Sequence, residues 1–204
     1  MLNLLFPSIE TERLIIRPIR IEDAEDMYQY ASDTENTNFV WFDLHQSLED
    51  SRKVIQEFFL TRVSKGIPEA YVMELKSTHQ MIGTCDVHTV RFGDVGELGY
   101  IINKRYWNQG YTTEAIKAII PILFHHCGFR RLEIQHDVLN IASQRIVEKA
   151  GFIYEGTYRQ RKIEKNGSIA SFHFYGLLRE DPIVLAKYSM NQSLKETYEK
   201  AISK

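Results

Sequence analysis

Apolar residues occur along the chain in short runs, several of which alternate with polar residues as β-strands do. Residues 98–102, Leu-Gly-Tyr-Ile-Ile, form one buried run, and residues 131–138 alternate around Leu132 and Ile134. Asn166-Gly167 separates the last two runs, and Asn-Gly between strand patterns predicts a tight hairpin. We expect strands over residues 13–19, 70–75, 81–90, 98–102, 131–138, 154–163 and 169–178.

Other stretches place apolar residues at the spacing of an amphipathic helix. Thr112 and Thr113 suit the start of one helix, and Pro121 farther along predicts a kink in it. Ser143 suits the start of another helix, which Gly151 would end. We expect helices over residues 23–30, 48–63, 112–126 and 143–149, an irregular segment over 33–47 and a helix-compatible tail after Pro182.

The order of these elements predicts an α/β fold. Strands separated by helices imply crossovers and parallel pairing, whereas strands joined by short turns imply antiparallel hairpins. No internal repeat, low-complexity block or linker divides the sequence. We expect a single domain over residues 1–204, with a core of about 9–180, a C-terminal extension over 181–204 and a central mixed β-sheet flanked by helices.

Composition narrows the class of protein. The 204 residues are 44% hydrophobic and 25% charged, which is the profile of a soluble globular protein. No apolar run has the length of a membrane helix, and the N-terminal residues lack the basic start of a secretory signal. The net charge of -2 argues against nucleic acid as the main partner. Cys85 and Cys127 show neither metal spacing nor a disulfide framework, so a cytoplasmic location is the simplest expectation.

Residues 97–116 have the layout of an anion-binding site. The run over 98–102 leads into a polar loop that ends at Gly110, directly before the predicted helix start. The free N–H groups of a first helical turn favour a phosphate, and glycine allows a ligand to approach the backbone closely. An ordinary strand-to-helix connection capped by threonine explains these residues equally well, so this stretch alone leaves both interpretations open.

Two segments together resemble the cofactor-binding motifs of the GNAT superfamily of N-acetyltransferases. Tyr106-Trp-Asn-Gln-Gly-Tyr-Thr-Thr-Glu-Ala115 resembles the acetyl-CoA pyrophosphate loop, and Asn140-Ile-Ala-Ser-Gln-Arg-Ile-Val-Glu-Lys-Ala-Gly-Phe152 resembles the second cofactor segment. Thr11-Glu-Arg-Leu-Ile-Ile-Arg-Pro18 and the final hairpin are similar to the branch that includes ribosomal-protein N-terminal (alanine/serine) acetyltransferases. The resemblance covers about residues 9–180.

The resemblance implies a central sheet that is splayed open between residues 98–102 and 132–138, with acetyl-CoA as the co-substrate. Unpaired backbone groups in such a gap would bind the pantetheine arm. Asn140 would then lie near this arm and Ser143 near the thioester sulfur. The cofactor-binding residues implied in this way are Tyr100, Ile101, Ile102, Gln109, Gly110, Tyr111, Thr112, Thr113, Asn140 and Ser143.

The sequence also departs from the family pattern. Trp107 stands where the loop usually begins with Gln or Arg, and Thr112 stands where its second small residue is Gly or Ala. Many members place a tyrosine near position 147 to protonate the leaving thiolate, whereas this chain has Val147. The remaining choices for the acid are Ser143, Tyr100, Tyr106 and water.

Glu97 is the leading candidate for the catalytic base, because it begins the strand beside the expected thioester site. The alternative is a glutamate at a strand edge with no catalytic role. Ser143 is the second catalytic candidate, as a partner for the thiolate, and it competes with a plain helix-capping role. Asn140 binds the cofactor or only shapes its turn.

Aromatic residues in the irregular segment, namely Phe39, Trp41 and Phe42, are candidates for binding the acceptor. They equally suit a small core beneath the loop. The basic residues within 159–162 either contact an acidic acceptor or form a solvated strand face.

The histidines show no metal-ligand spacing, so we expect no metal. His88, His136 and His173 are isolated on strand-like segments, and we expect each of them to be hydrogen-bonded or exposed. The cysteines suit buried apolar positions.

We expect an acetyl-CoA-dependent N-acetyltransferase that transfers an acetyl group directly to a primary amine, such as a protein N-terminus, in a ternary complex. One alternative is the acetylation of a small amine, for example a polyamine, an amino acid or an antibiotic. Another is a non-catalytic acyl-CoA sensor, which Val147 keeps open. The partners are then acetyl-CoA and the acceptor, and both a monomer and a homodimer are compatible with the sequence.

Overall fold

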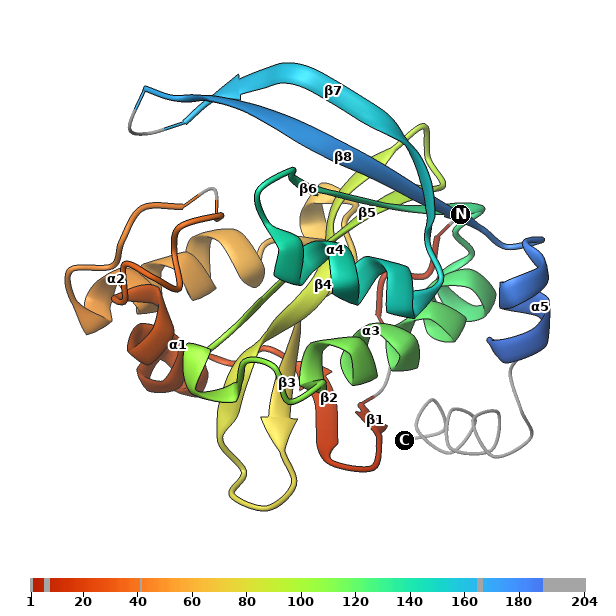
Figure 1. Cartoon of the computed structure of the whole chain (residues 1–204). Coiled ribbons are helices and arrows are strands. Elements are labelled where there is room, and N and C mark those ends of the chain that lie inside the picture. Colours follow the sequence, from red (N-terminus) through yellow and green to blue (C-terminus); the bar gives the residue numbers. More distant parts are fainter. Residues whose placement is uncertain (1, 6–7, 41, 165–166, 189–204) are drawn as a thin grey trace.

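A mixed β-sheet of eight strands forms the centre of the part of the chain that the structure describes (Figure 1). The computed structural model describes residues 2–5, 8–40, 42–164 and 167–188. The strands lie in the order β1-β2-β3-β4-β5-β6-β8-β7, and β5 runs parallel to β6 while the other neighbours are antiparallel. They are β1 (Ile9–Glu10), β2 (Leu14–Pro18), β3 (Tyr71–Leu75), β4 (Met81–Arg91), β5 (Val95–Ile102), β6 (Arg131–Asp137), β7 (Ile153–Ile163) and β8 (Ile169–Leu178).

Helices cover both faces of this sheet. On one face of the sheet α3 contacts β2, β4 and β5, and α4 contacts β6 (Figure 1). On the other face α1 contacts β4 and packs against α2. The helices are α1 (Ala24–Ala31), α2 (Leu48–Lys53), α3 (Tyr111–Ile122), α4 (Ile141–Ala150) and α5 (Pro182–Lys187). Val54–Phe59 and Leu123–Cys127 form π-helical turns, and Ile21–Asp23, Val63–Lys65 and Lys104–Tyr106 form 3₁₀ turns. No helix in the described ranges combines the length and apolar character that crossing a bilayer requires.

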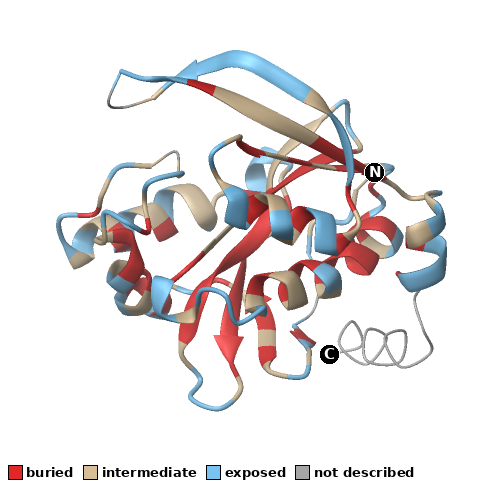
Figure 2. Cartoon of the chain, viewed as in Figure 1, coloured by how far each residue is buried: buried red, intermediate tan, exposed pale blue. Residues whose placement is uncertain are grey.

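Alternation along the strands divides the core into two clusters, one on each face. The buried residues concentrate in the central strands of the sheet and in the helices that pack on it (Figure 2). Tyr71 and Met73 of β3 belong to the larger cluster, which α3 and α4 cover. Val72 between them belongs to the smaller cluster, together with Met27 of α1 and Ile55. The α/β fold with a mixed, helix-flanked sheet that the sequence predicts is therefore confirmed.

The sheet splays open in the middle, between β5 and β6. The two strands pair at three positions, Val95 with Arg131, Gly96 with Leu132 and Glu97 with Glu133. Beyond Glu97, β5 continues to pair with β4, while β6 continues to pair with β8 as far as Asp137. The backbone edges of β5 and β6 that face each other past this point thus have no ladder partner in the described chain, as the family resemblance implies.

Two helix starts differ from the predictions. Gly110, and not Thr112 or Thr113, is the N-cap of α3, and its φ of 84° lies in the left-handed region that glycine adopts most easily. Asn140, and not Ser143, is the N-cap of α4, because its Oδ1 accepts a hydrogen bond from the Ser143 N–H at 3.0 Å. In both helices the predicted capping residue lies within the first turn, where its side chain is available for other contacts.

The helix predicted over residues 48–63 keeps α-helical geometry only as far as Lys53 and continues as the π-helical turn Val54–Phe59. The apolar spacing did not reveal this change, because one apolar face serves both geometries. After Pro121, α3 passes into a second π-helical turn at Leu123–Cys127, close to the predicted kink. The two residues of β1 are too few to show alternation, and the sequence did not predict them.

The end of the described chain packs on the core. Tyr188, directly after α5, donates a hydrogen bond from its hydroxyl to the Ala150 carbonyl at 2.8 Å. Within the predicted hairpin turn, Lys165 and Asn166 lie outside the described residues, as does the predicted extension beyond residue 188.

Arg17 of β2 forms a buried ion-pair network with a residue of β3 and a residue of the 3₁₀ turn before α1. Its guanidinium donates to Asp23 at 2.7 Å and to Glu74, and all three side chains are buried. We expect Arg17→Met to lower the free energy of unfolding by about 3–5 kcal/mol, because it leaves the buried Asp23 without its counter-charge and Glu74 with only His79, at 2.9 Å. Urea denaturation would measure this change.

Arg52→Met is the matched control, because Arg52 forms an exposed pair with Glu49 at 3.9 Å. Its loss should change stability by less than about 0.5 kcal/mol. Equal effects of the two substitutions would show that burial does not determine how much the network contributes to the free energy of unfolding.

Candidate active site

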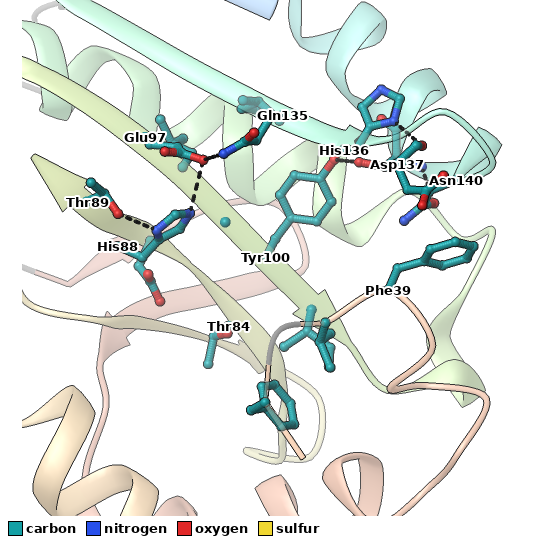
Figure 3. Close-up of a pocket in the computed structure, with 18 of the residues that line it drawn as sticks. Phe39, Thr84, His88, Thr89, Glu97, Tyr100, Gln135, His136, Asp137 and Asn140 are labelled. Atoms are coloured by element: carbon teal, nitrogen blue, oxygen red, sulfur yellow. Dashed lines mark hydrogen bonds and ion pairs between the residues drawn. The ribbon is translucent and has the colours of Figure 1, made fainter. Parts of the chain in front are cut away.

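A cavity of about 720 Å³ lies where the sheet splays open. The segment between α1 and α2 lines it on one side, and β4, β5 and β6 form its floor. Residues of the β7–β8 hairpin, including Arg161 and Phe172, also line it. Figure 3 shows side chains from the segment after α1 and from β4, β5 and β6 around this space.

Glu97 is the last residue of β5 that pairs with β6, and it faces the cavity (Figure 3). Its side chain is 2% exposed, yet its carboxylate is well supplied with donors. Arg91 Nη2 lies 2.5 Å from Oε2, and Gln135 donates to Oε1 at 2.5 Å. The buried carboxylate is therefore held in one position by a charged and a neutral donor.

Arg91 also joins the two strands at the point where they part. Glu97 of β5 stands directly beside Glu133 of β6, and like charges at neighbouring positions destabilise a sheet. Arg91 lies 2.5 Å from Glu97 and 3.4 Å from Glu133, so one guanidinium bridges both carboxylates. Arg131 supports Glu133 from the other side at 2.7 Å.

His88 brings an imidazole next to Glu97, which the sequence did not predict. It occupies an irregularity of β4 beside Gly99, where a Cβ would lie 2.7 Å from the imidazole Cδ2. The absence of a side chain at Gly99 lets the ring lie across β5. The Nδ1 atom contacts the Thr89 hydroxyl at 2.9 Å, and Nε2 lies 3.9 Å from Glu97 (Figure 3).

Burial makes His88 a neutral base at neutral pH. Removal from water lowers the pKa of His88 below its usual value, and the nearby negative charge of Glu97 opposes this effect only in part. A neutral imidazole can accept a proton, whereas Glu97 is already engaged with two donors.

Tyr100 and Ser143 meet across the gap. The Tyr100 hydroxyl lies 2.5 Å from Ser143 Oγ, which joins β5 to the first turn of α4. Burial raises the pKa of Tyr100, and the contact with Ser143 opposes this rise, so the phenol stays protonated at neutral pH. The pair therefore offers a hydroxyl donor at the cavity that His88 also lines.

The structure shows which of the candidate residues for the general acid line the cavity. Val147 is fully buried in the core. Tyr106 is not among the residues that line the cavity, and its hydroxyl donates to Gln80 at 3.0 Å. Among the candidate acid residues, Tyr100 and Ser143 thus lie at the cavity, and water remains a further choice.

Asn140 lines the cavity beside β6, although its Oδ1 is occupied by the N–H of Ser143. His136 is buried next to it, and its Nδ1–H donates to the Asp137 carbonyl at 2.8 Å. The Nε2 atom of His136 has no partner among the described residues.

The first turn of α3 forms a separate part of the site, outside the cavity lining. The turn over Gln109, Gly110, Tyr111, Thr112 and Thr113 exposes N–H groups that a helix leaves unpaired. Arg13 braces this turn: it donates to the Gln109 carbonyl at 2.9 Å, pairs with Glu114 at 2.7 Å and stacks on Tyr111 at 4.2 Å. A positive side chain and a helix N-terminus together suit an anion.

The structure places two of the three predicted aromatic residues at the cavity. Phe39, which is half exposed, and Phe42 both line it. Trp41 lies outside the described residues. Within the described chain, no group of three or more His, Cys, Asp or Glu residues could hold a metal ion.

A model of the family described as "Acetyltransferase (GNAT) domain" matches residues 13–153. The uncharacterized N-acetyltransferase YoaA of Bacillus subtilis is 30% identical over 177 residues, which is 86% of this chain and 98% of that protein. A GNAT-family acetyltransferase structure from Bacillus anthracis superposes with a TM-score of 0.76 at 24% identity and covers 85% of this chain and 99% of that one. The RimL ribosomal L7/L12 α-N-protein acetyltransferase, solved with coenzyme A, gives a TM-score of 0.75 at 19% identity, over 84% and 97% of the two chains.

The charge on Arg91 should control the protonation of His88. NMR titration of the imidazole should give a pKa below its usual value of about 6.5. Arg91→Gln should raise the pKa of His88, because the substitution removes one positive charge near the ring. The negative charge of Glu97 then acts on the imidazole without its counter-charge.

Arg105→Gln, which removes an exposed positive charge elsewhere, is the control and should leave the His88 titration unchanged. A pKa at or above 6.5 in the unmodified protein, or no rise in Arg91→Gln, would contradict this account of the site.

Proposed function

Because the chain belongs to the GNAT acetyltransferase family and is an acetyltransferase, we propose that it transfers the acetyl group of acetyl-CoA directly to a primary amine in a ternary complex. The observation that carries this proposal is the splayed junction of β5 and β6. There a neutral imidazole and a hydroxyl donor line one cavity. The reaction needs a proton acceptor for the amine and a donor for the leaving thiolate, and these two groups supply both.

The residues present suit acetyl-CoA. The N–H groups over Gln109 to Thr113, backed by Arg13, would hold the pyrophosphate. The edge of β5 at Tyr100 would pair with the pantetheine amides, and Asn140 and Ser143 would contact the arm from α4. The Ile102 carbonyl already accepts from Asn36 Nδ2 at 2.7 Å and from Trp107 Nε1 at 2.9 Å. Bound in this way, acetyl-CoA supplies a thioester carbonyl that an amine can attack.

The residues around the junction would then divide the work of acetyl transfer. His88 accepts the proton that the amine loses as its nitrogen forms a bond to the carbonyl carbon, and Glu97 stabilises the resulting imidazolium. Tyr100, backed by Ser143, donates a hydrogen bond or a proton to the sulfur as the carbon–sulfur bond breaks. General acid–base help of this kind contributes about 10²–10⁴-fold to a rate.

The cysteines do not favour a covalent acetyl-enzyme. Cys85 and Cys127 are both buried. Burial raises the pKa of Cys127 to about 12 and that of Cys85 well above its usual value, so neither is a thiolate at neutral pH. Direct attack by the amine on the thioester is the simpler route.

A protein N-terminus is the first acceptor to test. RimL, whose fold this chain shares, is described as acting on the α-amino group of ribosomal protein L7/L12. Phe39 and Phe42 offer apolar contact at the mouth of the cavity to a peptide or to a small amine. Release of free thiol from acetyl-CoA in the presence of peptides and small amines would identify the acceptor, and no release with any amine would overturn the enzymatic proposal.

Gly110→Asp should weaken acetyl-CoA binding by about tenfold or more, because it places a negative charge where the pyrophosphate would lie. Isothermal titration calorimetry would measure the affinity. Gly110→Asn is the matched control: asparagine has nearly the same bulk and tolerates the φ of 84° at this position, but it carries no charge. Equal affinities for the two variants would show that no phosphate binds at this turn.

Tyr100→Phe should lower kcat by about 10²-fold with little change in acetyl-CoA affinity, because it removes the hydroxyl that stabilises the thiolate. Tyr106→Phe removes a hydroxyl that contacts Gln80 outside the cavity lining, and its kcat should stay within about twofold of the parent. Steady-state kinetics would compare the two variants. A Tyr100→Phe enzyme with an unchanged kcat would leave Ser143 or water as the acid.

A further inference from the structure

A bulge in β4 determines how His88 faces the cavity. Val87 pairs with Leu98, and Thr89 pairs with Glu97, so β4 has one residue more than β5 at this point. Consecutive side chains of a regular strand point to opposite faces. Here His88 and Thr89 both line the cavity and contact each other (Figure 3). The bulge thus brings an imidazole to the cavity in addition to the residue that pairs with Glu97.

Arg62 contacts the two residues of β4 that directly precede His88. A bulge interrupts the hydrogen-bond ladder, so the backbone next to it gains from a partner outside the strand. Arg62 Nη1 donates to the Val87 carbonyl at 3.3 Å and to Asp86 Oδ1 at 2.5 Å. One guanidinium nitrogen therefore holds both a side chain and a backbone oxygen at the start of the bulge.

The guanidinium of Arg62 is itself fixed in place. The residue is 3% exposed and lies between the π-helical turn that ends at Phe59 and the 3₁₀ turn that begins at Val63. Its guanidinium stacks on Phe58 at 4.8 Å and on Phe59 at 4.7 Å. Its carbonyl accepts from the Ile67 N–H at 3.1 Å. A group held from so many sides can act as a fixed point for the strand that it contacts.

Two ion pairs surround the imidazole. Asp86 pairs with Arg62, and Glu97 pairs with Arg91. The two carboxylates favour the charged form of His88, and the two arginines disfavour it. Burial has the largest effect, and it lowers the pKa of His88. The loss of either member of one pair would leave the other member's charge acting on the ring alone.

We propose that Arg62 is a positioning residue, whose hydrogen bonds to the Val87 carbonyl and to Asp86 hold the β4 bulge in the form that places the His88 imidazole over Gly99. Arg62 acts through His88 in this role and does not take part in the proton transfer. The inference rests on the proposed function, because His88 is the proton acceptor of the proposed transfer.

NMR spectroscopy of the full chain tests the position of the ring. A Cβ on Gly99 would lie 2.7 Å from His88 Cδ2, so an Hα of Gly99 should give a nuclear Overhauser cross-peak with the imidazole Hδ2. Arg62→Met combined with Asp86→Leu replaces the ion pair with apolar side chains, an exchange that often preserves stability. This double variant should fold and lose the cross-peak, because the Val87 carbonyl loses its donor. A cross-peak of unchanged strength would overturn the proposal.

Arg17→Met is the matched control. It makes the same substitution in another buried ion-pair network, whose arginine does not line the cavity. Its urea denaturation should show a loss of stability, while the cross-peak between His88 and Gly99 and the pKa of His88 should stay as in the parent protein. Loss of the cross-peak in Arg17→Met as well would overturn the proposal, because lower stability alone would then displace the ring.

Titration of the His88 imidazole gives a second, independent readout. Arg62→Met should raise its pKa, because a positive charge is lost and Asp86 remains, whereas Asp86→Asn should lower it, because the positive charge of Arg62 then acts without a counter-charge. If Arg62 only stabilised the fold, both substitutions would expose the ring to water and raise the pKa. A rise in both would therefore overturn the proposal. Should Arg62→Met not fold, the cross-peak of the double variant decides.

The NMR measurements require no acceptor, so two kinds of failure can be distinguished. With an amine that the parent protein acetylates, the double variant should lower kcat by about 10²-fold, because a displaced base takes up the proton less well. If amines release thiol but the double variant keeps the cross-peak and the parent kcat, the inference fails and the proposed transfer stands. If no amine releases thiol while His88 responds to the substitutions as expected, the proposed transfer fails and the placement of the ring by Arg62 stands.

Discussion

The bridge that Arg91 makes between Glu97 and Glu133 is the contact on which the site depends. The carboxylates of Glu97 and Glu133 lie side by side at the last position where the parallel strands β5 and β6 pair. Without a shared cation they would repel each other. With the bridge in place, the strands stay paired up to this position and then diverge. Glu97 is thereby fixed at the base of the gap, and His88 is held beside it. The same contact thus lies where the sheet opens and holds Glu97 facing the opening.

The two faces of the sheet carry different groups. The turn at Gly110 and the first turn of α4 lie toward the face that α3 and α4 cover, and they carry the groups suited to acetyl-CoA. The other face, beneath α1 and the following segment, carries Arg62 and His45. The gap between β5 and β6 connects them, and Tyr100 and Ser143 meet across it. Beyond Glu97, the described parts of β5 and β6 no longer pair with each other. An acyl group and an amine bound on opposite faces of the sheet would meet there.

Most of the fold could be predicted from the sequence, because strand alternation, helical spacing and the Asn-Gly turn are local signals. The splay and the cofactor segments came from a family resemblance, since no local pattern shows that two parallel strands part after three pairs. His88 could not be predicted as a site residue, because its place beside Glu97 depends on the register of β4 and on the missing side chain of Gly99. Tyr100 and Ser143 are 43 residues apart, and their contact likewise exists only after the chain has folded. The helix caps were assigned to Thr112 and Ser143 by residue type, whereas the backbone conformations of Gly110 and Asn140 decided them.

The π-helical turn at Val54–Phe59 bears on how this protein could diverge from its relatives. A π turn holds one residue more than an α turn, so it behaves as an insertion absorbed within a helix. Loss of a single residue there would restore α-helical geometry and leave the flanking segments in phase, because the π turn takes up the extra residue locally. Phe58 and Phe59 lie within the turn and line the cavity, so their side chains would change direction. The turn at Gly110 and the strands of the sheet would keep their places. A change of one residue in length at this turn therefore alters one wall of the cavity and leaves the rest of the site as it is.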